Sequence, residues 1–526
     1  MKEVFALKED LIRSIEDAGS EYLRDESRST GFADYAAFPK TADETAAALE
    51  FARENDLAVT IQGGRTGVAA AAVPYGGLII NMSKMDHITG MSVRDGRYVI
   101  HAEPGVTLRE LRRQISARDT DVSGWTDDSL DTFRMFSADK EQFFPTDPTE
   151  TSATVGGMAA CNASGARSYL YKAMRKHVEG LRIILADGRF VTIHRGDVIA
   201  AGLRASLPCE DGSTVDFDVP SFRMPDVKNA SGYFAAPDMD ILDLLVGSDG
   251  TLGVIVELYL LLDPLPANIW GCACLFNDEQ EALDFVVSAK TVDNVAAIEY
   301  FDEGALRILR EQKKEGGVFD ALREIPEHTI SIVYTEVHCE SEDDAMAALV
   351  TLGELAVEAG GSEEDTWVAE TRSELEGLMF FRHAVPESVN MRIDALRKKD
   401  ANITKMGSDM SVPDDKLFEA VAMYRRGIKD IQVDSAIWGH IGDNHLHVNL
   451  LPQSREDAEK VRNMFLGWAK EITGMGGAVS AEHGVGKLKA SFLEIMYGPE
   501  HIEEMRAVKR AFDPEWRLGR NNMFTP

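Results

Sequence analysis

Cysteine is scarce in this 526-residue chain, and the few that occur are scattered. They form no C-x-x-C pair and their number is odd: Cys161, Cys209, Cys272, Cys274 and Cys339. A disulfide framework needs paired cysteines, and an iron–sulfur cluster needs them at characteristic spacings. The pattern therefore argues against both and fits a reducing compartment such as the cytoplasm.

Long apolar runs and basic stretches are also missing. The longest apolar run, Gly253 to Leu262, is too short for a membrane-spanning helix and contains Glu257. The first residues, MKEVFALKEDLIRSIED, indicate an amphipathic acidic helix and lack the basic start and apolar core of a signal peptide. We therefore expect no transmembrane segment and no secretion signal.

Positive charge is in short supply. The 55 Lys and Arg residues against 88 Asp and Glu leave a net charge of -33 at pH 7. Such a surface repels nucleic-acid phosphates and anionic lipid headgroups, so neither is an expected partner, whereas a basic protein would suit it. The length and the 44% hydrophobic content indicate a globular protein of two or three domains.

Glycine and small polar residues are plentiful in one stretch, FFPTDPTETSATVGGMAACNASGARSY, which covers Phe144 to Tyr169. Such a run cannot bury large side chains, but its backbone can come very close to a large ligand. Two further glycine clusters, VTIQGGRTG and VGSDGTLGVI, lie at 59–67 and 246–255. The first follows an expected strand and suits a pyrophosphate. Tight turns explain a single cluster equally well, but three in this order favour a nucleotide site.

These clusters, with EPGVTL at 103–108, resemble the flavin-binding domain of the vanillyl-alcohol oxidase (PCMH-type) family. The similarity is to the branch that holds D-lactate dehydrogenase, the glycolate oxidase flavoprotein subunit and D-2-hydroxyglutarate dehydrogenase. It implies FAD, held non-covalently because Arg65 and Thr66 cannot bond the ring. The implied FAD-binding residues are Gln62, Gly63, Gly64, Arg65, Thr66, Gly67, Pro145, Asp147, Thr151, Thr154, Gly156, Gly157, Asn162, Ser164, Gly165, Asp249, Gly253, Val254, Ile255 and Asn521.

The same resemblance implies an α+β fold with two parts: a two-lobed PCMH-type FAD-binding domain at 38–266 and an α/β, ferredoxin-like cap at 267–526. Residues 1–37 are expected to be helical. Thr41, with Glu44 three residues on, predicts a helix start, and Asp187-Gly188 predicts a hairpin. The ranges 117–142 and 208–233 are expected to be irregular.

Histidine is concentrated in two short segments of the cap, WGHIGDNHLHVNL at 438–450 and GGAVSAEHGVGK at 476–487. On a strand that starts at His445, positions 445, 447 and 449 share one face, and the preceding turn would bring His440 towards it. A single such His is more often structural. The cluster with Glu482 and His483 favours a metal site.

The resemblance assigns roles to these residues. His440, His447 and Glu482 match ligands of a divalent metal, with Zn²⁺ expected, and His483 matches a general base. Arg382 and Lys405 match cations that bind the substrate carboxylate, although Arg382 alone could equally be a surface charge. His445 replaces the family's Asn near the substrate, which leaves open both the identity of the substrate and the choice of metal-binding imidazole.

The implied activity is oxidation of a lactate-like D-2-hydroxy acid to the 2-oxo acid, by metal-assisted hydride transfer to flavin N5. Electrons would then pass to a separate acceptor, either an iron–sulfur protein or the quinone pool. The enzyme would be cytoplasmic, free or held at the membrane by its partner, and a homodimer is open. Two alternatives are a carbon–oxygen transferase similar to alkylglycerone-phosphate synthase and a flavin-free metal hydrolase or binding protein.

Overall fold

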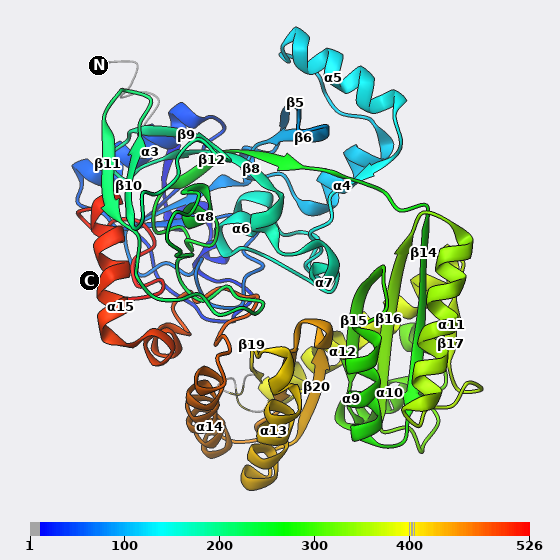
Figure 1. The fold of residues 1–526 in the computed structure, drawn as a ribbon. Coiled ribbons are helices and arrows are strands. Elements are labelled where there is room, and N and C mark those ends of the chain that lie inside the picture. Colours follow the sequence, from blue (N-terminus) through cyan, green and yellow to red (C-terminus); the bar gives the residue numbers. More distant parts are fainter. Residues whose placement is uncertain (1–10, 399, 401–402, 404, 526) are drawn as a thin grey trace.

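The computed structural model describes residues 11–398, 400, 403 and 405–525. These residues form a flavin-type domain of two lobes and a cap built on one large sheet (Figure 1). The expected α+β class and two-lobed architecture are confirmed. Of the described helices, none is both long enough and apolar enough to cross a membrane.

The first lobe is a four-stranded sheet in the order β1-β2-β4-β3. Its strands are β1 (Ile12–Ser14), β2 (Tyr35–Ala37), β3 (Val59–Gln62) and β4 (Leu78–Asn81), and α3 (Ala42–Glu54) packs beside it. The predicted start of α3 is confirmed, since the Thr41 hydroxyl accepts a hydrogen bond from Glu44 N at 3.1 Å.

The expected N-terminal helix is not found over residues 11–37. They hold β1, a single turn α2 (Ile15–Ala18), the 3₁₀ turn η1 (Ser20–Leu23) and β2, while residues 1–10 lie outside the described part of the chain. The reason is tertiary: β1 pairs with β2, which extends the sheet.

The second lobe is a five-stranded antiparallel sheet in the order β5-β6-β12-β8-β9. Its strands are β5 (Ile88–Arg94), β6 (Arg97–Ala102), β8 (Val178–Ile184), β9 (Phe190–His194) and β12 (Val254–Leu261). The β8–β9 hairpin at Asp187-Gly188 is confirmed. The same domain also contains the helices α4 (Leu108–Ala117), α6 (Val155–Cys161), α7 (Ser168–Tyr171) and α8 (Leu242–Leu245).

Two ranges expected to be irregular contain regular elements. Helix α5 (Asp127–Ala138) lies within 117–142, because Thr126 caps it by accepting from Ser129 N and Phe136 is buried in the core. The hairpin β10 (Arg204–Pro208) and β11 (Thr214–Asp218) overlaps 208–233, and its alternating residues Ala205, Leu207, Val215 and Phe217 are buried. A short pair, β7 (Gln142–Phe143) with β13 (Asp263–Pro264), ties the end of this domain to it just before the cap begins.

The cap sheet has the order β17-β14-β16-β15-β20-β21-β18, and β19 also pairs with β21. Alternate residues of its strands face opposite sides, so Cys272 and Cys274 pack in one core and Ala273 and Leu275 in the other. The strands are β14 (Asn268–Phe276), β15 (Val295–Phe301), β16 (Ser331–Cys339), β17 (Trp367–Ala369), β18 (Met406–Gly407), β19 (Met410–Ser411), β20 (Ser435–Gly439) and β21 (His445–Leu450).

Helices cover both faces of this sheet. The first face carries α9 (Glu279–Ala289), α11 (Glu342–Glu358), α13 (Leu417–Ile431) and α14 (Arg455–Gly474). The second carries α10 (Glu303–Glu315) and α12 (Arg372–Arg397).

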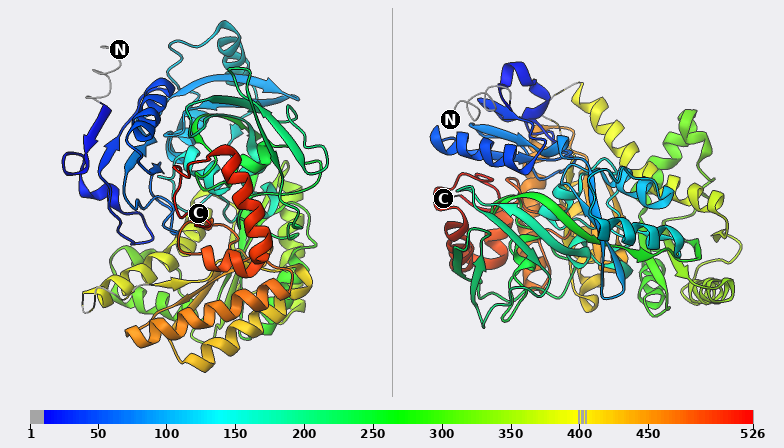
Figure 2. Two further views of the ribbon diagram at one scale, coloured as in Figure 1. Left: turned by 90° about the vertical axis from the view of Figure 1, so that its left-hand side faces the viewer. Right: turned by 90° about the horizontal axis from the view of Figure 1, so that it is seen from above.

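The end of the chain returns to the flavin-type domain. Helix α15 (Ala490–Phe512), red in Figure 2, contributes Leu493, Met505 and Phe512 to that domain's core. Leu518 also forms a β-bridge with Val59. Within the expected cap at 267–526, the buried cap core therefore ends at Val479, and α15 mainly braces the first domain, although Phe492, Ile495 and Met496 still pack against the cap core.

Candidate active site

The first two glycine loops pack directly against each other. A Cβ on Gly63 would lie 2.1 Å from Thr154 Oγ1, and one on Gly64 would lie 2.6 Å from Ser152 O. Both distances are far below contact, so only glycine allows this approach. Similarly, a Cβ on Gly165 would lie 2.0 Å from Asp147 O. The absence of a side chain at Gly165 thus lets the two ends of the central glycine loop pack together. The structure thus brings these predicted cofactor residues together.

The surface that they form fits a nucleotide. Gly67 would meet no atom within 4 Å of an added Cβ, and Gly157 is exposed, so backbone faces open space there. Thr154 Oγ1 and Ser164 Oγ are buried without a hydrogen-bond partner among the described residues. Open backbone beside unpaired hydroxyls is the environment that flavin and phosphate oxygens require.

Several predicted cofactor residues instead hold the loops in shape. Gln62 Nε2 donates to Tyr22 O and Ala72 O at 2.7 and 2.8 Å, and the Arg65 guanidinium lies over the Tyr22 ring. Asn162 Oδ1 accepts from Arg175 N at 2.9 Å. These side chains position the backbone around the cofactor surface. The remaining predicted cofactor residues also lie in the glycine loops or directly after them. They are Thr66, Pro145, Thr151, Gly156, Gly253, Val254 and Ile255.

Asp249 connects the third glycine loop to the histidine segment of the chain. Its Oδ2 accepts from Val485 N at 3.1 Å and from Gly486 N at 2.8 Å. Burial raises the pKa of this carboxyl to about 6, although the two N–H groups oppose the shift. The side chain of Asn522 donates a hydrogen bond to Asp249 O at 2.9 Å. Asn521, which the sequence analysis expected to bind the cofactor, has a left-handed backbone conformation.

The histidines converge as the strand pattern predicted. The turn η6 (Ile441–Asp443) closes with a hydrogen bond from His445 N to His440 O at 3.1 Å. One ligating atom from each of His440, His445, His447 and Glu482 lies within 4.8 Å of the others. On the opposite face of β21, Leu446, Val448 and Leu450 are buried in the core.

A carboxylate lies behind His440. Glu299 Oε1 is 2.6 Å from His440 Nδ1, and Glu482 Oε2 is 3.1 Å from its Nε2. Burial opposes protonation of His440, but these two carboxylates outweigh it and raise the pKa to about 9. Glu299 escaped the sequence analysis, and its only signal is a lone carboxylate in the apolar strand VAAIEYF.

His483 is held by Asp409, which the sequence analysis also missed. The buried Asp409 carboxylate accepts from His483 N at 3.0 Å, Glu482 N at 3.2 Å and Ser480 Oγ at 2.8 Å, and lies 3.3 Å from His483 Nδ1. Burial lowers the pKa of His483 although Asp409 opposes the shift, which favours the neutral ring.

Arg382 is buried and Lys405 is half-buried, so neither is a freely exposed surface cation. Arg382 Nη2 donates to Glu299 Oε2 at 3.2 Å, and its Nε has no acceptor among the described residues. Lys405 Nζ donates to Asn390 Oδ1 at 3.0 Å. Loss of water around the Lys405 ammonium lowers its pKa to about 8, and the positive charge of nearby Arg28 adds to the shift. Arg382 is therefore linked through Glu299 to the histidine cluster, and its free Nε–H could bind a carboxylate.

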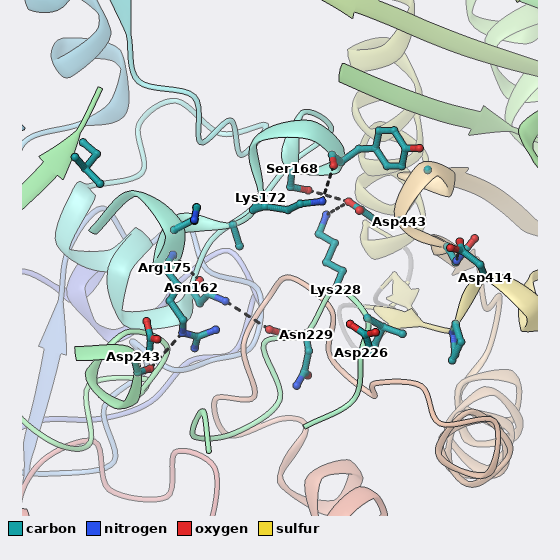
Figure 3. Close-up of a pocket in the computed structure, with 18 of the residues that line it drawn as sticks. Asn162, Ser168, Lys172, Arg175, Asp226, Lys228, Asn229, Asp243, Asp414 and Asp443 are labelled. Carbon is teal, nitrogen blue, oxygen red and sulfur yellow. Dashed lines mark hydrogen bonds and ion pairs between the residues drawn. The ribbon is translucent and has the colours of Figure 1, made fainter. Parts of the chain in front are cut away.

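A pocket of about 920 Å³ opens between the two domains beside this cluster (Figure 3). Its inner wall includes Lys228, whose Nζ lies 3.0 Å from Glu482 Oε2 and 3.8 Å from Asp443 Oδ2. Asp443 in turn accepts from Ser168 Oγ at 2.9 Å. The buried ammonium of Lys228 thus lies between the pocket and Glu482. No sequence motif had indicated Lys228.

Two family models match the chain. The model of the FAD binding domain covers residues 33–122 and 129–194. The model described as FAD linked oxidases, C-terminal domain, covers residues 265–523. Residues 195–264 lie between the two matches, and the second match begins at the boundary between the flavin-type domain and the cap.

Curated relatives match nearly the full length. D-lactate dehydrogenase of Archaeoglobus fulgidus is 29% identical over 482 residues, 91% of this chain and 88% of that protein. D-2-hydroxyglutarate dehydrogenase of Stutzerimonas stutzeri is 25% identical over 502 residues, 93% and 90% of the two chains. Among solved structures, 4-ethylphenol oxidase from Gulosibacter chungangensis shares the fold, with a TM-score of 0.65 at 15% identity over 100% of this chain and 98% of that one.

Proposed function

The chain belongs to the FAD-linked oxidoreductases, and from that membership we propose that it oxidises a small, lactate-like D-2-hydroxy acid to the 2-oxo acid. The observation that carries the proposal is the contact between Asp249 and the backbone of Val485 and Gly486. It holds the segment of Glu482 and His483 against the third glycine loop, so these acid–base groups would lie beside a flavin bound by the glycine loops.

The residues present fit both groups that this reaction needs. The glycine loops would hold non-covalent FAD, and His440, His447 and Glu482 would hold a divalent metal, with Zn²⁺ preferred. When bound, FAD supplies the two-electron acceptor and the metal supplies a Lewis acid for the 2-hydroxyl.

The chain's own side chains supply binding and proton transfer. Arg382 Nε and Lys405 Nζ would bind the substrate carboxylate, since both groups are cationic and both are at least half-buried near the cluster. His483 would take the hydroxyl proton on its free nitrogen while Asp409 holds the ring in place. The electrons would pass to a separate acceptor, either an iron–sulfur protein or the quinone pool, from an enzyme that is cytoplasmic or held at the membrane by that partner.

Metal analysis beside dye-linked turnover tests this assignment. We expect His440→Ala and Glu482→Ala to lose metal and activity but to keep FAD. His483→Ala should keep both groups and lose about 10²–10⁴-fold in kcat, because only proton transfer is removed. His328→Ala, at an exposed cap position, is the matched control. Full activity in chelator-treated wild type and in both ligand variants would contradict the metal role.

The substrate class and the cofactor linkage have their own readouts. A panel of D- and L-2-hydroxy acids with an artificial dye should show turnover of the D series. Acid precipitation should release the flavin into the supernatant, because neither Arg65 nor Thr66 can bond it. Yellow colour that stays in the pellet, or turnover restricted to L acids, would refute the corresponding part.

A further inference from the structure

His445 lies at the centre of the histidine cluster rather than facing a substrate space. It is the first residue of β21 and is fully buried. Its Nδ1 lies 3.6 Å from Glu482 Oε2, and its Nε2 lies 2.9 Å from Asp409 Oδ1. Neither nitrogen makes a well-aligned hydrogen bond to the described residues. A structural core histidine would be expected to have satisfied nitrogens, so this one calls for a further partner.

The surroundings of His445 repeat those of His440. Each imidazole lies between an outer carboxylate and Glu482: Glu299 stands behind His440, and Asp409 stands behind His445. Carboxylates in this position orient metal-ligating histidines and set their tautomer. The separations from Glu482 Oε2, 3.1 and 3.6 Å, are close to the roughly 3.0–3.4 Å expected between two atoms bound about 2.1 Å from one ion.

We propose that His445 is itself a metal ligand, so that His440, His445, His447 and Glu482 together hold one divalent ion. The inference deepens the proposed function and rests on its metal. Asp409 and Glu299 then serve as the two outer carboxylates. Three imidazoles and one carboxylate favour a transition metal over Mg²⁺ or Ca²⁺. A six-coordinate ion would still offer two positions, which is what a hydroxy acid needs to bind through its hydroxyl and carboxylate.

This assignment distinguishes the chain from the pattern that it resembles, in which Asn takes the place of His445. An Asn there would offer the ion only an amide oxygen, which suits a transition metal less well than an imidazole nitrogen. Asp409 would also hold two neighbouring parts of the site, His445 and the backbone of Glu482 and His483.

Cobalt substitution tests the ligand count without any turnover. The FAD-loaded full chain is stripped with a chelator and titrated with Co²⁺, and the visible d–d bands and the Kd are recorded. We expect His445→Asn to bind Co²⁺ at least about 100-fold more weakly, with a shifted spectrum. Asp409→Asn and Glu299→Gln should weaken binding by about 10–100-fold, as outer partners do. His328→Asn should match wild type.

X-ray absorption on the cobalt-loaded wild type gives a second readout that does not depend on any variant folding. Three imidazoles in the first shell support the proposal, and two overturn it. An unchanged Kd and spectrum in His445→Asn, beside a loss in His440→Asn, would overturn this inference alone. Wild type that takes up no Co²⁺, Zn²⁺ or Mn²⁺ would overturn it together with the metal role in the proposed function.

Discussion

Burial changes what individual cations can do in this protein. Arg382, taken alone in the sequence, could equally have been a helix-surface charge, but it is buried and paired with Glu299. Lys405 is half-buried, and its partial loss of water lowers its pKa to about 8. A guanidinium stays charged at any working pH, whereas an ammonium with this pKa does not. The two proposed carboxylate-binding residues should therefore respond differently to pH.

We predict that Lys405 produces an alkaline limb in the pH profile. The charged form is present below about pH 8 and disappears above it, so kcat/KM for the acid should fall as pH rises through about 8. Lys405→Met should lack that limb and lose roughly 10- to 100-fold in kcat/KM at pH 7, as for a lost charged hydrogen bond. Lys405→Arg should extend the plateau.

The check is dye-linked kcat/KM from pH 6 to 10. Lys470→Met, at an exposed position on α14, is the control and should keep the wild-type profile. If Lys405→Met shows the same limb at pH 8, another group is responsible.

At the scale of elements, loops rich in glycine and other small residues bring the parts of the cofactor surface together. Strand β3 ends at the first glycine loop, and helix α6 begins after Thr154 in the second. Their contact has no room for a methyl group at Gly63. The distance between these two elements thus depends on glycine, and the cofactor surface depends on that distance.

We predict that Gly63→Ala loses FAD rather than the fold. The added methyl would force the loop away from Thr154, and overpacking of this kind costs about 1–3 kcal/mol. The measurement is the flavin-to-protein absorbance ratio, with the FAD Kd after reconstitution. Gly377→Ala on α12 is the control, because its new Cβ meets nothing within 4 Å. That change should leave the flavin ratio unaltered and raise stability slightly. Full flavin content in Gly63→Ala would contradict the expected crowding.

At the scale of the whole molecule, the charge distribution is uneven. The chain carries -33 overall, yet the pocket of Figure 3 is lined by more cations than anions. Two of these cations, Lys172 and Lys176, are exposed at the pocket. An acidic protein repels an anionic substrate at a distance, so a local cationic lining would raise its rate of arrival.

We predict that reversing these charges slows substrate capture without changing the chemistry. The double variant Lys172→Glu, Lys176→Glu should lower kcat/KM at low salt by about tenfold or more while kcat is kept. The difference should vanish near 1 M salt, where the screening length is about 3 Å. Lys314→Glu, at an exposed position of α10, is the control. Equal salt dependence in the two variants would show that the substrate enters elsewhere.

Local interactions account for what the sequence by itself determined. The cap at Thr41, the hairpin at Asp187-Gly188 and the alternation along β21 each depend on residues a few positions apart, so their patterns are visible in one dimension. The three glycine clusters and the two histidine segments likewise carried the flavin and metal hypotheses, because such chemistry restricts residue types at short spacings.

Tertiary structure alone decided which partners complete the site. Glu299 meets His440 because β15 pairs with β20, although the two residues are 141 positions apart. Lys228 reaches Glu482 across 254 positions, and α15 returns to the first domain after the whole cap has been built. Contacts of this kind depend on strand order and domain docking, which no local periodicity encodes. The same physics gave residues 11–37 two strands and only two short helical turns in place of the expected helix, since pairing with a neighbouring strand outweighs weak helical propensity.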